Sequence, residues 1–485
     1  MKPFIQCVQV APVIQVAVVC LAMELCIKPA KADTAKPATG GTPHHAPSVA
    51  AQPTHSVSAL EFMGLPARMA NRARSGQPVI GPSEVELRRI FQRAVDAAIQ
   101  RSPEVSRSQA EQQVAVWDID EAKGQRWPQV DIGSKSQPVQ FGKGLKNQGN
   151  SASINLTVTT LLYDWGRVSK TIGSREKLGV AADEKLAAQI ETTSHEVLST
   201  LIELGKQRII SDLGQQFSSR MQDLVKMLAG IVAVDPGRTS ELTQAKARLL
   251  QAQALHDATE AKMRFAEMTL SKLVGERVVP IPLTKEWNIG LAKLEPLLTA
   301  ASNHPAIRQT IAQVESAELQ AEAVRASGLP QLNLGISKST ATDALGREQP
   351  WQASLAMGWS VFRGGSIRAS ERAALQRADA GRFDIAQQRR ELEFRILAAD
   401  KDARTQLERA ELYRELSAES DRIRDAFHQQ WYHLGKRTLL DVLMAESDHH
   451  GNQVSEITNR FDGYQAIVRQ YASAGMLAQW LQGSE

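Results

Sequence analysis

The sequence predicts a mainly α protein with a small β part, in which one unit occurs twice. A short strand-like stretch appears at residues 127–133 (Trp-Pro-Gln-Val-Asp-Ile-Gly) and again at residues 329–335 (Leu-Pro-Gln-Leu-Asn-Leu-Gly). The proline in the second position of each stretch recurs at the same spacing as Pro103 and Pro305. A constant spacing between similar segments indicates an internal duplication.

Each copy of the unit carries two strands. Apolar residues alternate with polar ones after each proline, which is the period of a strand rather than a helix. A second alternating run follows in each half, at residues 154–162 and 353–361. Both second runs end at an aromatic-x-x-Gly corner, at residues 163–166 and 362–365. The chain therefore supplies four strands, two from each half.

Most of the remaining chain has helical periodicity. Ser83 and Glu86 form a capping box that starts the first helix, and Pro103 breaks that helix because proline lacks a backbone donor. No proline occurs from Gly166 to Val234, so one helix of about 100 Å is expected there. The predicted helices are 83–125, 166–234 and 240–274, with a turn at 235–237, and then 291–327, 365–432 and 438–476, with a turn at 434–436.

The helix lengths constrain the packing. In each half the long helix is about twice as long as the return helix that follows its turn. The helix before the strands is long enough to cover the rest of the long helix, if it lies end to end with the return helix. Each half is therefore expected to form a long hairpin of one continuous and one composite helix, with strands at one end. We place the two repeats at residues 83–285 and 286–485.

The first 32 residues have the pattern of a secretory signal peptide. An apolar run follows Lys2 and ends before an A-x-A cleavage site at residues 30–32. A membrane anchor is the alternative, but the run is short and interrupted by polar residues. A lipid on Cys26 is a second alternative, although large residues precede that cysteine. All three cysteines lie in this segment, so the mature chain is expected to lack disulfides and thiolate metal sites.

The next segment, residues 33–82, is rich in Ala, Pro, Thr, Gly and His and lacks sustained periodicity. This composition predicts a disordered linker. His44, His45 and His55 are expected to be solvated residues of this linker rather than a metal site. The whole chain of 485 residues has a formal net charge of +4 and a pI near 8.9, which does not favour nucleic-acid binding.

No motif predicts an enzyme. Residues 144–151 have the spacing of a P-loop, but Asn150 replaces the lysine that must reach phosphate. His195 lacks the second histidine of a zinc protease motif. His449 and His450 are neighbours on a predicted helix, so they point to different faces and suit a metal poorly. We predict no catalytic residue, no cofactor and no metal site.

The four strands predict a membrane-spanning sheet. Strands of about ten residues have the length to cross an outer membrane at a tilt. Four strands cannot close a barrel, and an open edge is not tolerated in lipid, so several chains must contribute. A trimer would give twelve strands. A small antiparallel sheet on a soluble helical protein is the alternative. Because they alternate with polar residues, four side chains are predicted to face lipid: Leu156, Val158, Leu355 and Met357.

Residues 432–443 (Tyr-His-Leu-Gly-Lys-Arg-Thr-Leu-Leu-Asp-Val-Leu) resemble the tip motif of the TolC family of outer-membrane channel-tunnel proteins, which reads aromatic-x-x-Gly-x-x-Thr-x-x-Asp-Val-Leu. The resemblance covers nearly the whole chain from residue 83 to residue 476. It implies a homotrimer with a twelve-stranded transmembrane β-barrel and an α-helical barrel that extends through the periplasm. It also implies a water-filled lumen that stays closed at the periplasmic tip until an inner-membrane partner docks.

The same resemblance suggests a lock at that tip. Tyr432 and Arg437 match the aromatic and basic lock residues on the second hairpin, and Ser240 and Glu241 match their partners on the first. The chemistry is reasonable, because arginine can bridge a hydroxyl and a carboxylate, and tyrosine can donate to a carboxylate. The alternative is that these are ordinary polar residues beside a turn, above all for Ser240.

A constriction is implied next to the lock. Asp441 matches the first acidic residue of the family's constriction, and three copies would form a negative ring that favours cations. Met444 stands at the second acidic position, which indicates a more apolar constriction. The alternative for Asp441 is a capping residue early in a helix, where a carboxylate suits the helix dipole.

These features predict an outer-membrane export duct that extends into the periplasm. Residues 163–166 and 238–245 look most like the secretion branch of the family, which implies export of protein, such as a large adhesin, with a periplasmic adaptor and an inner-membrane ABC transporter. The first alternative is the duct of a proton-driven drug or metal efflux pump. The second is a structural coiled-coil periplasmic protein, which would need no alternating strands.

Overall fold

The computed structural model describes residues 81–136, 152–275, 279–341 and 347–483. The predicted signal peptide, nearly all of the predicted linker, including its three histidines, and the whole P-loop-like stretch lie outside the described residues. The first half contains α1 (Glu84–Arg101), α2 (Pro103–Gly124), β1 (Gln129–Ser136), β2 (Ala152–Tyr163), α3 (Arg167–Val234), η2 (Pro236–Arg238) and α4 (Thr239–Val274). The second half contains α5 (Leu294–Ala301), α6 (Pro305–Ala326), β3 (Gln331–Ser339), β4 (Gln352–Gly358), α7 (Ser366–Tyr432), α8 (Leu439–Ala474) and α9 (Leu477–Gln482).

The helices begin and break where local chemistry predicts. The Ser83 hydroxyl accepts from the Glu86 N–H at 3.3 Å, and the Glu86 carboxylate accepts from the Ser83 N–H at 3.1 Å, which completes the capping box. Pro103 and Pro305 each stand at the first position of a new helix, where a missing N–H costs nothing. The two long helices have 68 and 67 residues, so both are continuous as expected. The short helix α9 is not predicted by the sequence pattern.

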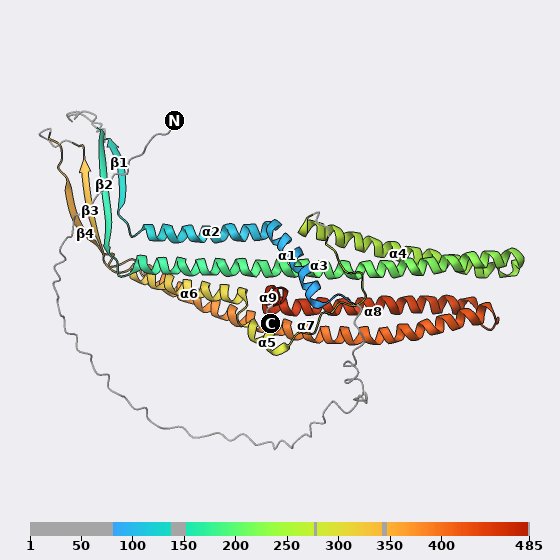
Figure 1. The fold of residues 1–485 in the computed structure, drawn as a ribbon. Helices are drawn as coiled ribbons and strands as arrows, with labels where there is room; N and C mark the ends of the chain where they lie inside the picture. The colour runs from blue at the N-terminus through green and yellow to red at the C-terminus, as the bar shows by residue number, and fades with distance from the viewer. Residues whose placement is uncertain (1–80, 137–151, 276–278, 342–346, 484–485) are drawn as a thin grey trace, which may run out of the picture. The chain divides into compact units, whose positions relative to one another are not determined.

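The composite hairpins are present, with one addition. In Figure 1, α2 and α4 follow one another along one side of α3, and both pack against it. Likewise α6 and α8 both pack along α7. The addition is that α6 and α8 also pack along α3, so the two repeats share α3 as a common surface. The strands lie at one end of the helices and the two turns at the other.

The four strands form one antiparallel sheet in the order β1-β2-β3-β4. The second strand of the second half ends at Gly358, three residues earlier than the sequence pattern indicates. Gly358 pairs with Gln331, the first residue of β3. Gln331 is preceded by Pro330, which has no N–H to continue the ladder of hydrogen bonds. The predicted residues 359–361 therefore lack a partner strand.

The main core lies where α1, α3 and α8 meet. Trp287 comes from the extended segment between α4 and α5 and packs against Phe461 at 4.9 Å and Tyr464 at 6.2 Å between ring centroids. Tyr464 Oη accepts from the Trp287 N–H at 3.1 Å. A side chain at Gly205 of α3 would collide with the indole, at 2.6 Å from its ring. This close approach pins the segment that joins the two repeats.

None of the helices in the described part of the chain is both long and apolar enough to cross a membrane.

Candidate functional site: the tip hairpins and the sheet

The first tip is a tight turn between α3 and α4. Asp235 caps η2, because its carboxylate accepts from the Gly237 N–H at 3.1 Å. Arg238 then donates twice to the Glu241 carboxylate, at 2.7 and 3.2 Å. Ser240 is exposed beside this pair. The predicted acidic partner of the lock is therefore engaged by an arginine of its own hairpin.

The second tip is closed by a capping box at the start of α8. The Thr438 hydroxyl accepts from the Asp441 N–H at 3.3 Å, and the Asp441 carboxylate accepts from the Thr438 N–H at 3.1 Å and from its hydroxyl at 3.0 Å. These bonds lower the pKa of Asp441. Gly435 supplies the left-handed turn before the box, with φ of 59°. Asp441 thus caps α8, as the alternative for it predicts, and its place in a constriction stays a prediction.

Arg437 and Tyr432 lie on the exposed surface of the second tip. Arg437 Nε donates to Gln430 Oε1 at 3.3 Å, and the guanidinium lies 4.2 Å from the centroid of the Phe427 ring. Tyr432 is exposed, and its ring contacts His428 and His433. Both predicted donors therefore remain at the surface, where a neighbouring chain can reach them.

Within one chain a different contact joins the two tips. The Arg238 guanidinium of the first hairpin lies 5.9 Å from the ring centroid of Trp431 on the second. Trp431 is only 6% exposed and belongs to an apolar cluster with Phe217, Met221 and Leu443. The partners shown for Glu241 and Arg437 lie on their own hairpins, so the predicted lock stays a prediction. Arg238 and Trp431 are not among the residues predicted from the sequence, although the spacing of Arg238, three residues before Glu241 at a helix start, favours an ion pair.

An apolar stripe lies beside the capped aspartate. Leu440 and Met444 are four residues apart on α8, so they share one face, and they are 47% and 51% exposed. Leu434 in the turn is exposed as well. That Met444 makes the constriction more apolar stays a prediction, because the constriction itself requires several chains.

The strand register places most apolar side chains of the sheet on one face, which also carries Lys338 opposite Leu156, and polar side chains on the other. Cross-strand partners share a face, and the apolar pairs are Val130 with Val158, Ile132 with Leu156, Leu334 with Leu355, and Leu332 with Met357. The opposite face carries pairs such as Asp131 with Thr157 and Gly335 with Ser354. All four side chains predicted to face lipid, Leu156, Val158, Leu355 and Met357, thus lie on the same face. Within the described chain, β1 and β4 each pair with one strand only, so two edges are open.

Aromatic side chains surround the end of the sheet that meets the helices. Trp127, Tyr163, Trp165, Trp359 and Phe362 are all exposed there. The indole N–H of Trp165 donates to the Pro330 carbonyl at 2.8 Å, and that of Trp359 donates to the Gly328 carbonyl at 3.1 Å. Tryptophan and tyrosine favour the boundary between lipid and water, so this belt fits one margin of a membrane.

Two flanks of the helical part carry exposed apolar side chains. α2 and α4 form one flank of the described chain and α7 the other, because α3, α6 and α8 lie between them. The exposed apolar residues are Val114, Trp117, Leu255, Phe265 and Met268 on the first flank, and Phe383, Phe394, Leu397, Leu412 and Leu416 on the second. Two different apolar surfaces on opposite flanks suit a head-to-tail ring of identical chains.

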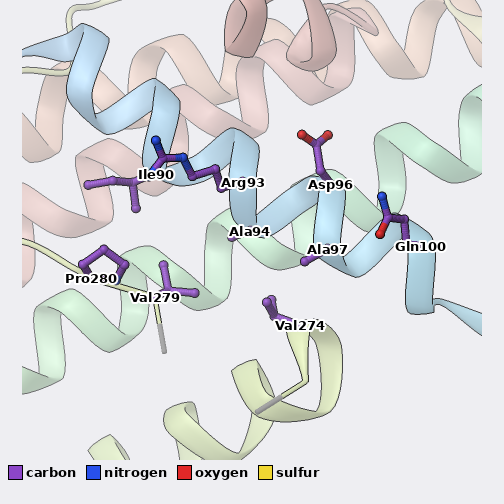
Figure 2. Close-up of a pocket in the computed structure, with 9 residues that line it drawn as sticks. All are labelled: Ile90, Arg93, Ala94, Asp96, Ala97, Gln100, Val274, Val279 and Pro280. Carbon is purple, nitrogen blue, oxygen red and sulfur yellow. The ribbon is translucent and has the colours of Figure 1, made fainter. Parts of the chain in front are cut away.

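In the described ranges, no group of three or more His, Cys, Asp or Glu side chains is placed to hold a metal ion. His449 and His450 point to different helices, as the sequence predicts. A cavity of about 400 Å³ lies between α1 and the end of α4, and its lining includes Ile90 and Ala94 on α1 and Val274 at the end of α4 (Figure 2).

Long helical hairpins, a sheet with one apolar face and two open edges, and tips with exposed polar donors together define a channel-forming protein of the outer membrane. The family model of outer membrane efflux proteins matches residues 94–276 and 297–476. The chain therefore belongs to the outer membrane efflux protein family, the TolC-like channels. It is an outer-membrane channel protein that extends into the periplasm, and not an enzyme. Channels of this family are homotrimers that work with periplasmic adaptors and inner-membrane pumps.

Individual relatives are distant in sequence but close in fold. The outer membrane efflux protein BepC of Brucella suis is 22% identical over 332 residues, which is 66% of this chain and 71% of BepC. The outer-membrane channel OprN superposes with a TM-score of 0.71 at 19% identity, covering 81% of this chain and 92% of OprN. VceC of Vibrio cholerae gives 0.69 at 15% identity, covering 79% and 96%. These structures confirm the predicted fold class.

Proposed function

We propose that the chain forms the homotrimeric outer-membrane duct of a type I secretion system and exports protein from an ABC transporter through a periplasmic adaptor. The sheet is the observation that supports a duct, because in a single chain it has one apolar face and two open edges. Unpaired edge groups in lipid cost several kcal/mol each, on the order of a lost hydrogen bond or more, so the sheet must close with sheets of other chains. Three chains bring twelve strands, in keeping with the even strand numbers of outer-membrane barrels.

The helical flanks support the same closure. We propose that α7 of one protomer packs against α2 and α4 of the next, so that the exposed apolar residues of both flanks become buried. A ring of this kind leaves the polar face of the sheet towards the lumen and the apolar face towards lipid. At the tip it brings Arg437 and Tyr432 of one hairpin close to Ser240 and Glu241 of a neighbouring first hairpin, where the predicted lock would form. The Leu440 and Met444 stripe would then line the narrowest point.

The assignment to protein secretion rests on short motifs. The Tyr-Asp-Trp-Gly corner at residues 163–166 and the tip at residues 238–245 resemble the secretion branch. Both motifs make specific contacts. The Trp165 indole donates a hydrogen bond to Pro330 of the other repeat, and Arg238 contacts both Glu241 and Trp431. We also propose that residues 1–32 are removed on export and that residues 33–82 form a linker. The two repeats then occupy residues 83–285 and 286–485.

Deletion of the gene tests whether the duct exports protein or small molecules. We expect a large protein to disappear from the culture medium while susceptibility to dyes, detergents and antibiotics stays unchanged. Re-expression of the chain should restore secretion. The second candidate is a duct for small-molecule efflux, which the name of the relative BepC favours. Increased drug susceptibility with an unchanged set of secreted proteins would replace the first proposal by the second.

A further inference from the structure

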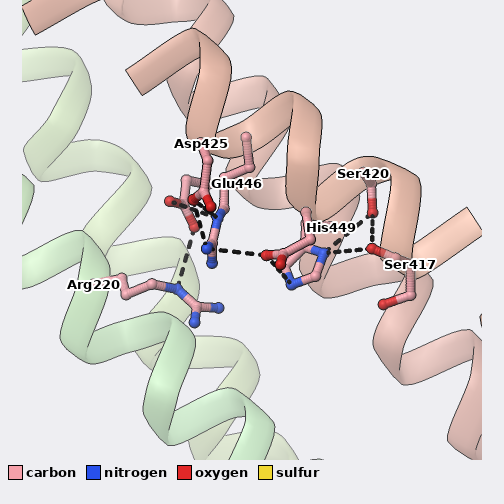
Figure 3. A network of polar contacts seen from close by, with 8 residues as sticks. Arg220, Ser417, Ser420, Asp425, Glu446 and His449 are labelled. Atoms are coloured by element: carbon pink, nitrogen blue, oxygen red, sulfur yellow. Dashed lines mark hydrogen bonds and ion pairs between the residues drawn. The ribbon is translucent and has the colours of Figure 1, made fainter. Parts of the chain in front are cut away.

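A polar cluster crosses the packed interface between the two hairpins, in their tip-ward half (Figure 3). Arg220 of α3 reaches Glu446 of α8, with 3.2 Å between Nε and Oε2. The Glu446 side chain is only 8% exposed. Arg424 of α7 approaches the other oxygen of the same carboxylate, with 3.9 Å between Nε and Oε1. Three helices from the two repeats therefore meet at one buried carboxylate.

The ion pair across this interface is poorly satisfied. Among the described residues, Arg220 Nε and Nη2 and Glu446 Oε2 have no hydrogen-bond partner, although they are buried. A buried ion pair repays the loss of hydration only when its hydrogen bonds are good. Burial accordingly raises the pKa of Glu446 despite its two arginine neighbours. The ion pair between Arg220 of α3 and Glu446 of α8 is therefore weak.

His449 strengthens only the side that faces α7. Its Nδ1 lies 3.1 Å from Ser420 Oγ and 3.2 Å from the Ser417 carbonyl oxygen, and its Nε2 lies 3.5 Å from an Asp421 carboxylate oxygen. α7 and α8 belong to the same hairpin. The second hairpin is therefore held together here by several polar contacts, whereas its contact with α3 depends on other groups.

His450 is a second side chain of α8 that contacts α3 beside this ion pair. Its ring stacks flat on Phe217, with 4.5 Å between centroids and 3° between planes. Nδ1 of His450 is buried and has no hydrogen-bond partner among the described residues. Arg220 lies one turn along α3 from Phe217, so a cation already occupies this side of the ring. Burial, Arg220 and His449 together lower the pKa of His450 to about 4, so the ring is neutral at pH 7.

We propose that these contacts form an acid-sensitive latch, in which protonation of His450 separates α8 from α3 and lets the second tip hairpin move away from the first. The latch is defined as Phe217 and Arg220 on α3 with Glu446 and His450 on α8. A proton on the ring places a second charge beside Arg220 and leaves the buried N–H without an acceptor. The interface then opens at the face where the two repeats meet, and α7 moves with α8. The tip constriction widens as a consequence.

The direction of the pH effect follows from the charged groups around the latch. The groups that face it are Arg220 on α3, Arg248 on α4, Asp421, Arg424, Asp425 and His428 on α7, and Glu446 and His449 on α8. The closed latch lowers the pKa of His450 below that of a solvated histidine. Its stabilising contribution is therefore complete above about pH 6.5 and is lost as the pH falls towards 4. At pH 5 the ratio of open to closed latch should rise by up to about 30-fold per protomer, if the open state exposes the ring fully.

Glu446 acts in the opposite sense. Its pKa is raised in the closed latch, so the charged carboxylate opposes closure at neutral pH, and its protonation in acid favours the buried position. The expected acid response is thus the histidine effect reduced by the glutamate effect. This opposition gives a sharp test, because replacing Glu446 by a neutral residue of the same shape should enlarge the response.

The experiment compares single-channel open probability of the purified full-length trimer in planar bilayers at pH 7.5 and pH 5.0. We expect the wild type to open more in acid by about tenfold or more. His450→Phe keeps an aromatic stack without a charge and should lose most of this response. His433→Phe, in the exposed turn, is the matched control and should keep it. Glu446→Gln should increase it.

Trimer integrity is checked for every variant by its resistance to SDS before heating. A wild type that does not respond to acid would overturn the proposal. So would an intact His450→Phe trimer that responds as the wild type does. If Glu446→Gln loses the response and His450→Phe keeps it, Glu446 is the group that senses acid. That result would also overturn the proposal. These results bear on the latch alone, because secretion or efflux by the duct is measured separately by gene deletion.

Discussion

Arginine in place of Leu355 tests whether the apolar face of the sheet lies in lipid. Leu355 sits in the middle of β4, opposite Leu334, and is 64% exposed in the chain. Because most of the side chain touches no protein, its replacement removes little packing. In water such a surface change would alter stability by about 0.5 kcal/mol or less. Near the middle of a membrane it should cost about 2–4 kcal/mol per protomer, or about 6–12 kcal/mol per trimer.

The assay is the amount of SDS-resistant trimer in outer-membrane fractions. Leu355→Arg should reduce it strongly. Ser354→Arg is the matched control, because it lies next in the chain on the polar face, opposite Gly335. We expect its trimer to assemble. The reasoning is refuted if Ser354→Arg fails and Leu355→Arg assembles, because the faces are then reversed. If both assemble equally well, the sheet does not lie in lipid as proposed.

Three further changes test the tip. Tyr432→Phe combined with Arg437→Ser removes the proposed lock donors at the exposed surface, so the trimer should stay intact while its conductance in planar bilayers rises; an unchanged conductance would count against the lock. Trp431→Ala removes a buried side chain and should destabilise the tip by about 3–5 kcal/mol, measured as a lower Tm by circular dichroism, whereas the exposed Leu434→Ala should change little. Thr438→Ala removes the capping hydroxyl of α8 and should cost about 1 kcal/mol by the same measurement, and no shift in Tm would contradict the capping role.

Trp165 shows how the repeats differ within a common plan. It has a φ of 58°, and Gly364, in the corresponding corner of the second repeat, has 59°. A non-glycine residue in this conformation costs about 1–2 kcal/mol. The hydrogen bond of its indole to Pro330 and its edge-on contact with Tyr163, at 5.1 Å between centroids, offset this strain. The corner sequence alone therefore indicates a turn, but not which residue bears the strain.

The sequence by itself determined what depends on near neighbours in the chain. Pro103 and Pro305 mark the helix breaks because a proline acts on the turn that contains it, and Ser83 starts α1 through a hydrogen bond to Glu86, three residues away. The alternation of apolar and polar residues likewise predicts the strands and the two faces of the sheet. A period of two assigns each side chain to a face before any partner strand is known.

Tertiary structure decided the contacts between distant segments. The sequence does not show that α6 packs on α3 as well as α7, that Arg238 lies over Trp431, or that Glu241 is engaged by Arg238 rather than by the second hairpin. β4 ends at Gly358 because its partner strand begins after Pro330, although its own alternation continues to residue 361. The physical reason is the same in each case. A periodic pattern specifies which face of an element is apolar, whereas the partner of that face is chosen by shape and charge across the whole fold.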